Sequence, residues 1–359
     1  MKTNNFVPRL IAWELTRTCN LDCIHCRASA SRGTYEGELT TDEVFRILEE
    51  ITEVGHPIVI LTGGEPLLRV DLLEIARKAT SLNLKPVLAT NGTLLTRELA
   101  LELKDAGISR VSISLDGATA KTHDDFRKMP GAFEGALRGI HVLKEVGLSF
   151  QINTTVTAVN AEELPKVHQL AKALGADAHH IFLLVPVGRG KELAEDSLSP
   201  EKYEAILHWF YEQRERSELH LKATCAPHYY RILRERAKAD GKEVTYETFG
   251  LDAVTRGCLA GTGFCFISHQ GVVQTCGYLE IPCGDLRKNT FREVWEGSEI
   301  FNKLRDFKNY KGKCGRCEYI RVCGGCRARA YEATGDYLEE EPLCTYQPIK
   351  ERVLSQREA

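Results

Sequence analysis

Along the first half of the chain, short apolar runs alternate with longer amphipathic stretches. The apolar runs have the length and composition of buried strands and fall at residues 10–15, 57–61, 86–90, 110–115, 150–156 and 179–185. Between them, apolar residues recur at intervals of three and four, which predicts helices over residues 44–54, 72–82, 97–106, 133–146 and 164–174. A capping box at Thr40–Glu43 opens the first helix, and the helices end near glycines at Gly55, Gly107, Gly147 and Gly175.

This alternation of strand and helix predicts an α/β fold with a parallel sheet, because each helix must cross back over the sheet with the usual right hand. Six such units fit a partial (β/α)6 barrel of the TIM type, and a doubly wound sheet fits the same alternation. Active sites of barrels lie at the C-terminal ends of the strands. Asn91, Asp116 and Asn153 fall at such ends, as do a cysteine loop and a Gly-Gly-Glu-Pro turn.

The cysteine loop contains Cys19, Cys23 and Cys26 in the spacing C-x3-C-x2-C, directly after the first predicted strand. A cubane iron–sulfur cluster has four irons, and one cysteine normally holds each of them. Three cysteines therefore leave one iron open for a substrate or cofactor, as a catalytic zinc keeps one position open. A zinc site, or a set of buried free thiols, is the alternative that the spacing alone leaves.

The turn after the second strand is Leu61-Thr-Gly-Gly-Glu-Pro66, in which two glycines let the backbone come close to a ligand. Together, the turn and the cysteine loop resemble the radical S-adenosylmethionine (SAM) enzymes, and the resemblance favours the barrel. It implies that the three cysteines bind a 4Fe–4S cluster whose open iron chelates SAM. It also implies that Gly63, Gly64 and Glu65 hold the amine of SAM.

Polar residues at the ends of later strands match further parts of such a site. The resemblance implies that Asn91, Ser114 and Asn153 line the ribose and carboxylate of SAM. The structural alternative is that Asn91-Gly92 is a common strand-ending turn.

After residue 185 the regular alternation stops, and we expect three parts in the chain. These are a radical SAM barrel core over residues 1–215, a bridge over residues 216–255 and an auxiliary-cluster domain over residues 256–359. The bridge has helical spacing before it, at residues 200–215, and carries Lys222, His228, Tyr229 and Arg231. These four residues are candidates to meet an acidic substrate, and a solvated helix face explains them equally well.

The other ten of the 13 cysteines lie in the second half of the chain, with Cys225 standing apart in the bridge. The paired C-x2-C spacings fit a zinc ribbon, and they also resemble the SPASM auxiliary-cluster domain of radical SAM enzymes. The resemblance implies one 4Fe–4S cluster, or two. One set of ligands is Cys314, Cys317, Cys323 and Cys344; the other is Cys258, Cys276 and Cys326, with Cys265 as a candidate fourth. The pair Cys323–Cys326 is closer than the C-x3-C that is usual in this domain.

Composition narrows the class of protein further. The net charge is −3 and the sequence pI about 6.4, without the basic domain that nucleic-acid binding needs. No run of apolar residues is long enough for a membrane span, and the first residues lack the apolar segment of a signal peptide. An odd number of cysteines in such a chain indicates metal ligation in the cytoplasm rather than a disulfide framework.

Segments over nearly the whole chain resemble the haem b synthases of the alternative, siroheme-dependent pathway; they include residues 10–30, 151–157, 179–191, 222–231 and 257–279. The resemblance implies oxidative decarboxylation of two propionates of iron-coproporphyrin III to vinyl groups. In each round the deoxyadenosyl radical takes a hydrogen atom, carbon dioxide leaves, and one electron passes to an auxiliary cluster. The same resemblance implies that a low-potential electron donor of the flavodoxin or ferredoxin type reduces the enzyme.

A flat, anionic macrocycle would need cationic clamps and a ligand for its iron. The candidates are Arg27, Arg32, Arg189, Lys222 and Arg231 for the carboxylates, and His179, His180 and His228 for the iron. Other functions also fit the motifs: a sister enzyme acting on didecarboxysiroheme or in haem d1 synthesis, or a peptide-modifying SPASM enzyme. A non-catalytic iron–sulfur electron carrier would not need the Gly-Gly-Glu-Pro turn.

Overall fold

Ten strands form one sheet in a computed structural model that describes residues 6–193 and 197–349. Their order across the sheet is β10-β9-β8-β1-β2-β3-β4-β5-β6-β7. The strands are β1 (Leu10–Glu14), β2 (Ile58–Thr62), β3 (Lys85–Thr90), β4 (Val111–Ser114), β5 (Phe150–Val156), β6 (Ala178–Leu183), β7 (His220–Thr224), β8 (Phe264–Ile267), β9 (Val272–Gln274) and β10 (Gly284–Asp285).

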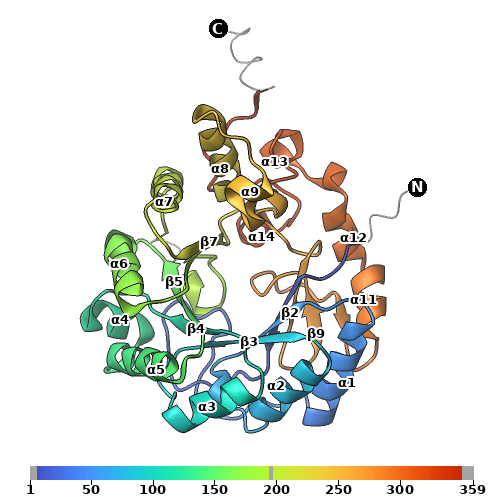
Figure 1. The fold of residues 1–359 in the computed structure, drawn as a ribbon. Coiled ribbons are helices and arrows are strands. Elements are labelled where there is room, and N and C mark those ends of the chain that lie inside the picture. The colour runs from blue at the N-terminus through green and yellow to red at the C-terminus, as the bar shows by residue number, and fades with distance from the viewer. Residues whose placement is uncertain (1–5, 194–196, 350–359) are drawn as a thin grey trace.

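The eight strands from β8 through β1 to β7 run parallel to one another. The antiparallel pairs are β8 with β9 and β9 with β10. The sheet curves into an arc, with α1 to α6 arranged along its outer side (Figure 1). Helices on one side of a curved parallel sheet confirm the predicted partial barrel and exclude the doubly wound alternative. The strands predicted from the sequence are β1 to β6.

Fourteen α-helices lie in the described residues. They are α1 (Thr41–Thr52), α2 (Leu72–Ser81), α3 (Arg97–Asp105), α4 (Ala120–Arg127), α5 (Ala132–Val146), α6 (Leu164–Leu174), α7 (Pro200–Gln213), α8 (His228–Ala239), α9 (Tyr246–Phe249), α10 (Leu251–Val254), α11 (Phe291–Gly297), α12 (Glu299–Arg305), α13 (Gly312–Arg316) and α14 (Arg327–Thr334). The 3-10 turns are η1 (Pro66–Leu68), η2 (Ala161–Glu163), η3 (Gly188–Leu193) and η4 (Phe307–Asn309).

The predicted helix ends agree with the structure except at one glycine. The capping box between Thr40 and Glu43 is present, and Gly107, Gly147 and Gly175 have positive φ. Gly55 is not among the residues with positive φ, and α1 ends before it. A Cβ at Gly55 would lie 2.8 Å from a methyl of Val7, so this glycine makes room for the N-terminal segment.

Side chains alternate between the two faces of the curved sheet. On the outer face, under the helices, residues such as Ile11, Leu61 and Ile113 have no exposed surface. On the inner face the side chains are partly exposed, so the interior is not filled as it is in a closed barrel. This interior, here called the bore, is lined by Ala12, Ile60, Val87, Ala89, Ser114, Asn153, Thr155, His180, Phe182, Lys222 and Thr224.

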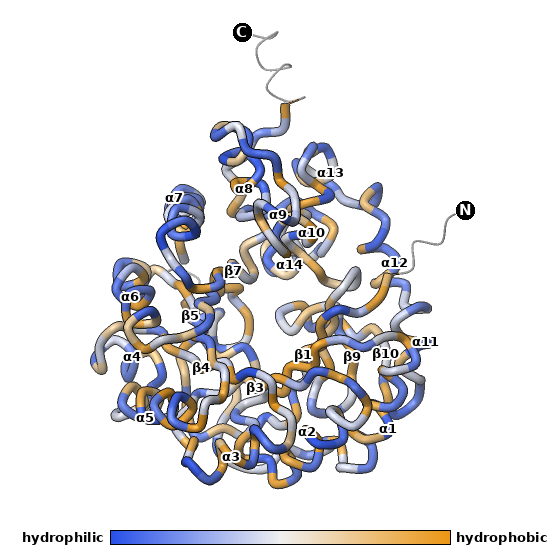
Figure 2. The backbone as a smooth tube through the Cα atoms, in the orientation of Figure 1, coloured by the Kyte–Doolittle hydropathy of each residue, from blue (hydrophilic) through white to orange (hydrophobic). Residues whose placement is uncertain are grey.

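The C-terminal third closes the ring on the side that the helices leave open. Its strand β8 lies beside β1, with Cys265 opposite Ile11, and the indole of Trp295 donates to the carbonyl of Phe6 at 2.8 Å. In Figure 2 the apolar segments lie along the strands, while the outer helices carry the polar segments. The predicted bridge contains β7 and α8, so one sheet includes strands from all three predicted parts. The predicted starting point at residue 1 and end point at residue 359 lie outside the described residues.

Candidate active site

The cysteine loop follows β1 and lies at the C-terminal ends of the strands. Cys19 and Cys23 are buried and Cys26 is partly exposed. Backbone amides are directed at two of the sulfurs: Leu21 N–H donates to Cys19 Sγ at 3.4 Å, and Ala30 N–H donates to Cys26 Sγ at 3.4 Å. Burial raises the pKa of the Cys19 thiol to about 12, so a thiolate here needs a cation beside it. Sulfurs that accept hydrogen bonds from backbone amides, as Cys19 and Cys26 do, suit an iron–sulfur cluster.

The two glycines of the turn after β2 are required by the residues that lead into the cysteine loop. The amide of Gly64 donates to Thr16 O at 2.7 Å, and the amide of Glu65 donates to Thr18 O at 2.8 Å. A Cβ at Gly63 would lie 2.4 Å from the carbonyl oxygen of Thr16, and one at Gly64 would lie 2.5 Å from that of Thr18. The glycines therefore let the turn lie directly against the cysteine loop.

Glu65 is fully buried, and its carboxylate holds the ends of β2 and β3 together. It accepts hydrogen bonds from Thr90 Oγ1 at 2.7 Å, from the Asn91 amide at 2.8 Å and from the Leu67 amide at 3.1 Å. Burial nevertheless raises its pKa. The carboxylate is thus occupied within the protein, as are the amides of Gly64 and Glu65, so a ligand at this turn would meet backbone carbonyls.

Asn91 directly follows β3 and Ser114 is the last residue of β4, as predicted, whereas Asn153 lies in the middle of β5 and not at its predicted place at the strand end. The side-chain amide of Asn91 donates to Asn20 Oδ1 in the cysteine loop at 2.8 Å. Ser114 and Asn153 face each other across β4 and β5, both partly exposed on the inner face. Asn153 Oδ1 accepts a hydrogen bond from Gln151 Nε2 at 2.9 Å. Asn91 thus contacts the cysteine loop directly, and the role of the three residues toward SAM stays a prediction.

A buried cation, which the sequence did not predict, stands beside Cys23. Arg127 Nη1 donates to Cys23 Sγ at 3.6 Å, and the guanidinium forms an ion pair with fully buried Asp116. Asp116 also accepts the Thr155 amide at 2.7 Å. No cysteine, glycine or aromatic motif surrounds Arg127 in the sequence, and α4, which carries it, was not predicted.

The four cysteines predicted to hold one auxiliary cluster line a single small cavity, together with His228 and Arg231; they are Cys314, Cys317, Cys323 and Cys344. Arg327 Nη2 donates to Cys314 Sγ at 3.4 Å, and the Gly325 amide donates to Cys323 Sγ at 3.5 Å. Gly324 and Gly325 both have positive φ, and a Cβ at Gly325 would lie 3.0 Å from the sulfur of Cys314. The short Cys-Gly-Gly-Cys spacing is therefore a tight glycine turn beside the cavity.

The second predicted group is Cys258, Cys276 and Cys326. Cys276 packs in one apolar cluster with Cys326 and in another with Cys258. The amide of Cys258 donates to the carbonyl of Cys323 at 3.1 Å, which joins the two groups. Cys265, the candidate fourth ligand, lies elsewhere: it is fully buried within the core of the sheet, and its nearest thiol neighbour is Cys283.

Among the described residues, no three His, Cys, Asp or Glu side chains surround a single metal ion. A zinc ribbon draws its thiolates to about 2.3 Å from one ion. The cubane spreads its ligands over four irons and so needs a wider arrangement of thiolates than a single zinc ion does.

Comparison with known proteins agrees with this geometry. A model of the Radical SAM superfamily matches residues 13–171, and a model of the iron–sulfur cluster-binding domain SPASM matches residues 258–327. The chain is 58% identical over 343 residues to the AdoMet-dependent heme synthase of Methanosarcina barkeri, covering 96% of this chain and 98% of that protein. The chain belongs to the radical SAM family.

This radical SAM enzyme is also similar to a second enzyme in sequence and to a solved structure in fold. It is 32% identical to the Fe-coproporphyrin III synthase of Methanosarcina barkeri, over 93% of this chain and 87% of that one. The crystal structure of Streptococcus suis SuiB bound to S-adenosylmethionine superposes with a TM-score of 0.75 at 16% identity, covering 95% of this chain and 78% of that chain. At that identity the superposition shows the shared fold alone.

As a radical SAM enzyme with a SPASM domain, the protein uses SAM, a 4Fe–4S cluster and auxiliary iron–sulfur clusters. No helix among residues 6–193 and 197–349 has both the length and the apolar character to cross a membrane.

Most residues suggested for porphyrin contact are engaged within this radical SAM enzyme. Arg27 forms an ion pair with Glu14, Arg189 donates to the carbonyl of Cys23 at 2.8 Å, and Arg231 pairs with Glu204 and Glu235. Buried His179 contacts Thr154 and His168, and His228 lines the cavity of the four cysteines. Of the eight suggested residues, His180 and Lys222 face the bore, and Arg32 lies exposed in the loop after the cysteines.

Proposed function

We propose that this radical SAM enzyme is a haem synthase that converts two propionates of iron-coproporphyrin III to vinyl groups and so forms haem b. The observation that carries the proposal is the end-to-end similarity to a heme synthase at 58% identity. That identity is far above the 32% to the Fe-coproporphyrin III synthase, which favours the haem-forming reaction over the sister reaction.

The proposal assigns the cofactors to the residues described above. Cys19, Cys23 and Cys26 would hold the cluster that binds SAM. The SAM nucleotide would lie against the backbone of Gly63 to Glu65 and against Asn91, Ser114 and Asn153. The auxiliary domain would begin near residue 256 and hold one cluster through Cys314, Cys317, Cys323 and Cys344, and a second through Cys258, Cys276 and Cys326.

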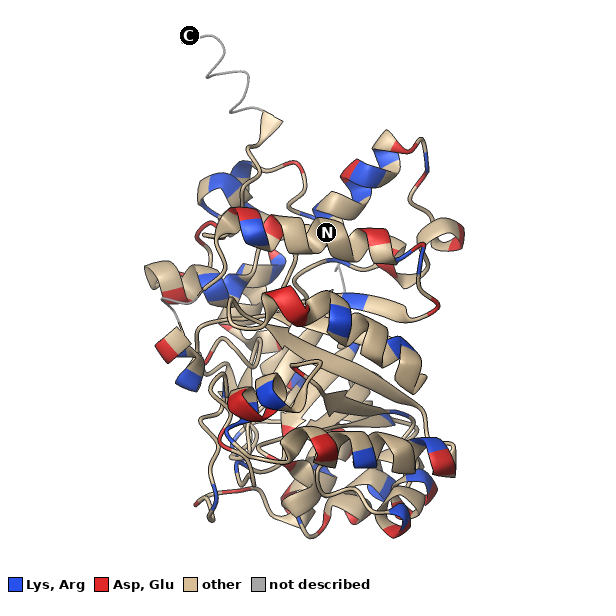
Figure 3. Ribbon diagram, turned by 90° about the vertical axis from the view of Figure 1, so that its left-hand side faces the viewer, with Lys and Arg blue, Asp and Glu red and all other residues tan. Residues whose placement is uncertain are grey.

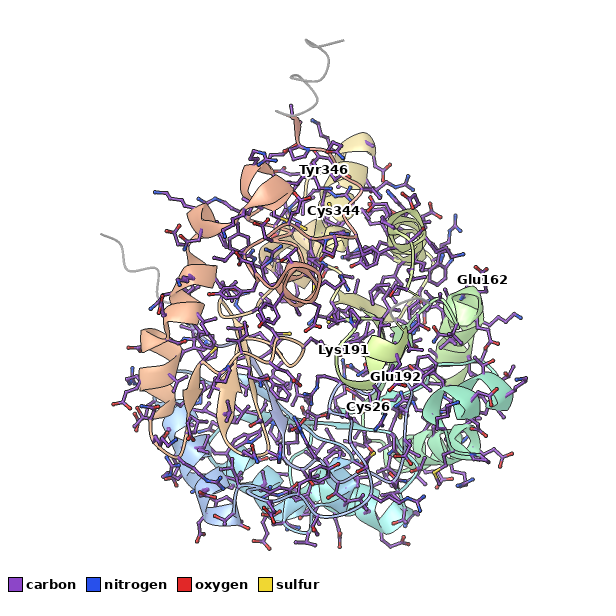
Figure 4. All side chains as sticks on the ribbon, turned by 180° about the vertical axis from the view of Figure 1, so that it is seen from behind. Cys26, Glu162, Lys191, Glu192, Cys344 and Tyr346 are labelled. Atoms are coloured by element: carbon purple, nitrogen blue, oxygen red, sulfur yellow. The ribbon has the colours of Figure 1, made fainter. Side chains whose placement is uncertain are left out.

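A largely apolar cavity next to η3 has room for part of a porphyrin. Its volume is about 290 Å³, and its walls come from the end of β6, η3, α7, α14 and the segments beside them; they include Leu183, Leu184, Pro186, Leu198, Leu343 and Lys191. The turn η3 lies against the cysteine loop, because the amide of Arg189 donates to Cys26 O at 3.0 Å. In Figure 4, Cys26 lies near Lys191 and Glu192 and well apart from Cys344. A large ligand in this cavity would lie between the two cluster regions.

The bore has an apolar side and a polar side, which suits an apolar ring that carries carboxylate groups. On β1 to β3 it is lined by apolar residues such as Ala12, Ile60 and Val87, whereas β5 to β7 contribute Asn153, His180 and Lys222. Lys222 is the cation in this wall. Burial lowers its pKa, and a propionate would supply the negative charge that stabilises its protonated form.

When bound, the cluster and SAM supply a 5′-deoxyadenosyl radical, which abstracts hydrogen atoms. In the proposed reaction the β-carbon of a propionate loses a hydrogen atom. The bond between the α-carbon and the carboxylate then breaks, so that carbon dioxide leaves and a vinyl group remains. One electron must also leave the substrate for each propionate. A low-potential donor of the flavodoxin or ferredoxin type would supply the electron that starts each round.

Arg27 connects the cysteine loop to the auxiliary cysteines. This connection suits a reaction in which a hydrogen atom is abstracted at the first cluster and an electron leaves through the second. Arg27 follows Cys26 directly, and its Nη1 donates to the carbonyl of Gly277, next to Cys276, at 3.4 Å. Its guanidinium also lies over the ring of Phe266, 4.4 Å from the centroid. A single buried side chain thus holds the cysteine loop against the auxiliary group.

Anaerobic incubation with SAM, dithionite and iron-coproporphyrin III tests the function. We expect haem b and two molecules of carbon dioxide per porphyrin, with a three-propionate intermediate at early times. Formation of 5′-deoxyadenosine without a change in the porphyrin would assign the enzyme another substrate. Didecarboxysiroheme and peptide substrates serve as comparison reactions.

A further inference from the structure

Cys225 stands 33 positions before Cys258 in the sequence, yet the fold brings it to the auxiliary group. It follows β7, on the opposite side of the ring from β8. Cys225 and Cys276 both pack against the apolar cluster that contains Cys326. Burial raises the pKa of the Cys225 thiol well above its ordinary value, and the neighbouring thiols of Cys326 and Cys276 raise it further.

The backbone holds Cys225 in a conformation that has a cost. Its φ is 55°, in the left-handed region, which residues other than glycine rarely adopt. Two buried donors fix its carbonyl: Arg329 Nη2 at 2.5 Å and Tyr203 Oη at 3.1 Å. The two hydrogen bonds to the carbonyl hold the backbone of Cys225 in this left-handed conformation, and the backbone in turn fixes the position of the thiol.

The anchor of Cys225 is also the anchor of Cys326. Arg329 lies three residues after Cys326, and its Nε donates to Glu341 Oε1 at 2.9 Å. The other carboxylate oxygen of Glu341 accepts the amide of Cys326 at 2.6 Å. Cys225 and Cys326 are thus positioned by one buried ion pair, although the first follows β7 and the second directly precedes α14.

We propose that Cys225 is the fourth thiolate ligand of the auxiliary cluster held by Cys258, Cys276 and Cys326. The proposal rests on the auxiliary ligands assigned above and is independent of the porphyrin substrate. It replaces Cys265, which lies in the core of the sheet. Four thiolates leave no iron of this cluster open, so the cluster would transfer electrons and would not bind substrate.

The test uses the full-length, anaerobically reconstituted enzyme and the variants Cys225→Gly and Cys265→Ala. Glycine is chosen because it removes the thiol and accepts the left-handed backbone without strain. For Cys225→Gly we expect one auxiliary EPR signal to be lost or converted to a 3Fe–4S signal. Iron should fall by about one to four atoms per chain, since each iron has one cysteine. Cys265→Ala should match the parent protein in both measurements.

Unchanged iron content and EPR spectra in Cys225→Gly would overturn the proposal, as would the loss of an auxiliary signal in Cys265→Ala alone. Circular dichroism of each variant shows whether the protein is folded. Because the readout is the cluster itself, a failure here is distinct from a failure to form haem.

Discussion

At the scale of single residues, the sulfurs of the predicted cluster ligands have hydrogen-bond donors directed at them. The donors are backbone amides for Cys19, Cys26 and Cys323, and guanidinium groups for Cys23 and Cys314. Donors of this kind stabilise thiolates and set the potential of an iron–sulfur cluster. The surroundings of the sulfurs, more than their spacing in the sequence, indicate that the thiols act as ligands.

The first prediction concerns the separation of the cluster regions. Replacing Cys19 by alanine should abolish cleavage of SAM, while iron remains bound in the C-terminal part of the chain. Iron analysis and chromatography of 5′-deoxyadenosine measure the two effects. Complete loss of iron would indicate that the regions share one site.

The second prediction concerns Arg127. In Arg127→Met, Asp116 is left buried without its cation, which should cost about 3–5 kcal/mol of unfolding free energy. The potential of the N-terminal cluster should also fall, because the positive charge beside Cys23 is gone. Urea unfolding and EPR-monitored redox titration measure the two effects. Adding Asp116→Asn should restore much of the stability but not the potential; an unchanged potential in both variants would contradict this role.

At the scale of helices and strands, the sequence predicted elements whose apolar pattern is complete. Strands β1 to β6 and helices α1, α2, α3, α5, α6 and α7 were found in this way. β7 was missed because its inner face carries Lys222 and Thr224, which interrupt the apolar run. Helices α11 and α12 are separated at Ser298, whose ψ of 124° is extended. α4 was missed because five of its eight residues are charged or histidine.

For the candidate site, local motifs were predictable and long-range contacts were not. The glycines of the turn after β2 were expected to approach a ligand, and the structure shows that they approach residues 16–18. The ion pair of Arg127 with Asp116 and the position of Cys225 depend on how separate strands are arranged, which no periodicity encodes.

The third prediction concerns the close packing of Gly64 against residues 16–18. In Gly64→Ala the new methyl would lie 2.5 Å from two backbone carbonyls, so the turn and the cysteine loop must separate. Overpacking of this kind costs about 1–3 kcal/mol, and we expect SAM cleavage to fall by about ten- to a hundredfold. Gly297→Ala is the matched control, because a Cβ there meets nothing within 4 Å. Equal rates of 5′-deoxyadenosine formation in the two variants would refute the prediction.

At the scale of the whole molecule, charge is distributed without a dominant patch. On the side that Figure 3 shows, acidic and basic residues are interspersed along the helices. Electrostatic stability depends instead on buried groups, such as the Arg329–Glu341 pair and several neutral histidines.

The fourth prediction is a loss of stability in mild acid. Burial lowers the pKa of His123 to about 3, of His168 to about 4 and of His179 to about 3. In the unfolded chain the value is about 6.5, so the unfolded state binds more protons below that pH. The stability from these neutral histidines is complete above about pH 6.5 and is lost as the pH falls toward 4.

The loss amounts to at most about 1.4 kcal/mol per pH unit for each histidine. Urea unfolding between pH 7.5 and 5 measures the slope, and His179→Gln should make it shallower. A slope that is the same in the variant would show that His179 does not contribute.

The pairing of β8 with β1 sets the order in which the protein can assemble on the ribosome. The nascent chain emerges from its N-terminus, so β1 appears first and its partner β8 appears only after some 250 further residues. Until then one edge of β1, the strand that leads into the cysteine loop, has no neighbour. We therefore expect a chain truncated before residue 264 to retain the N-terminal cluster less well than the full chain.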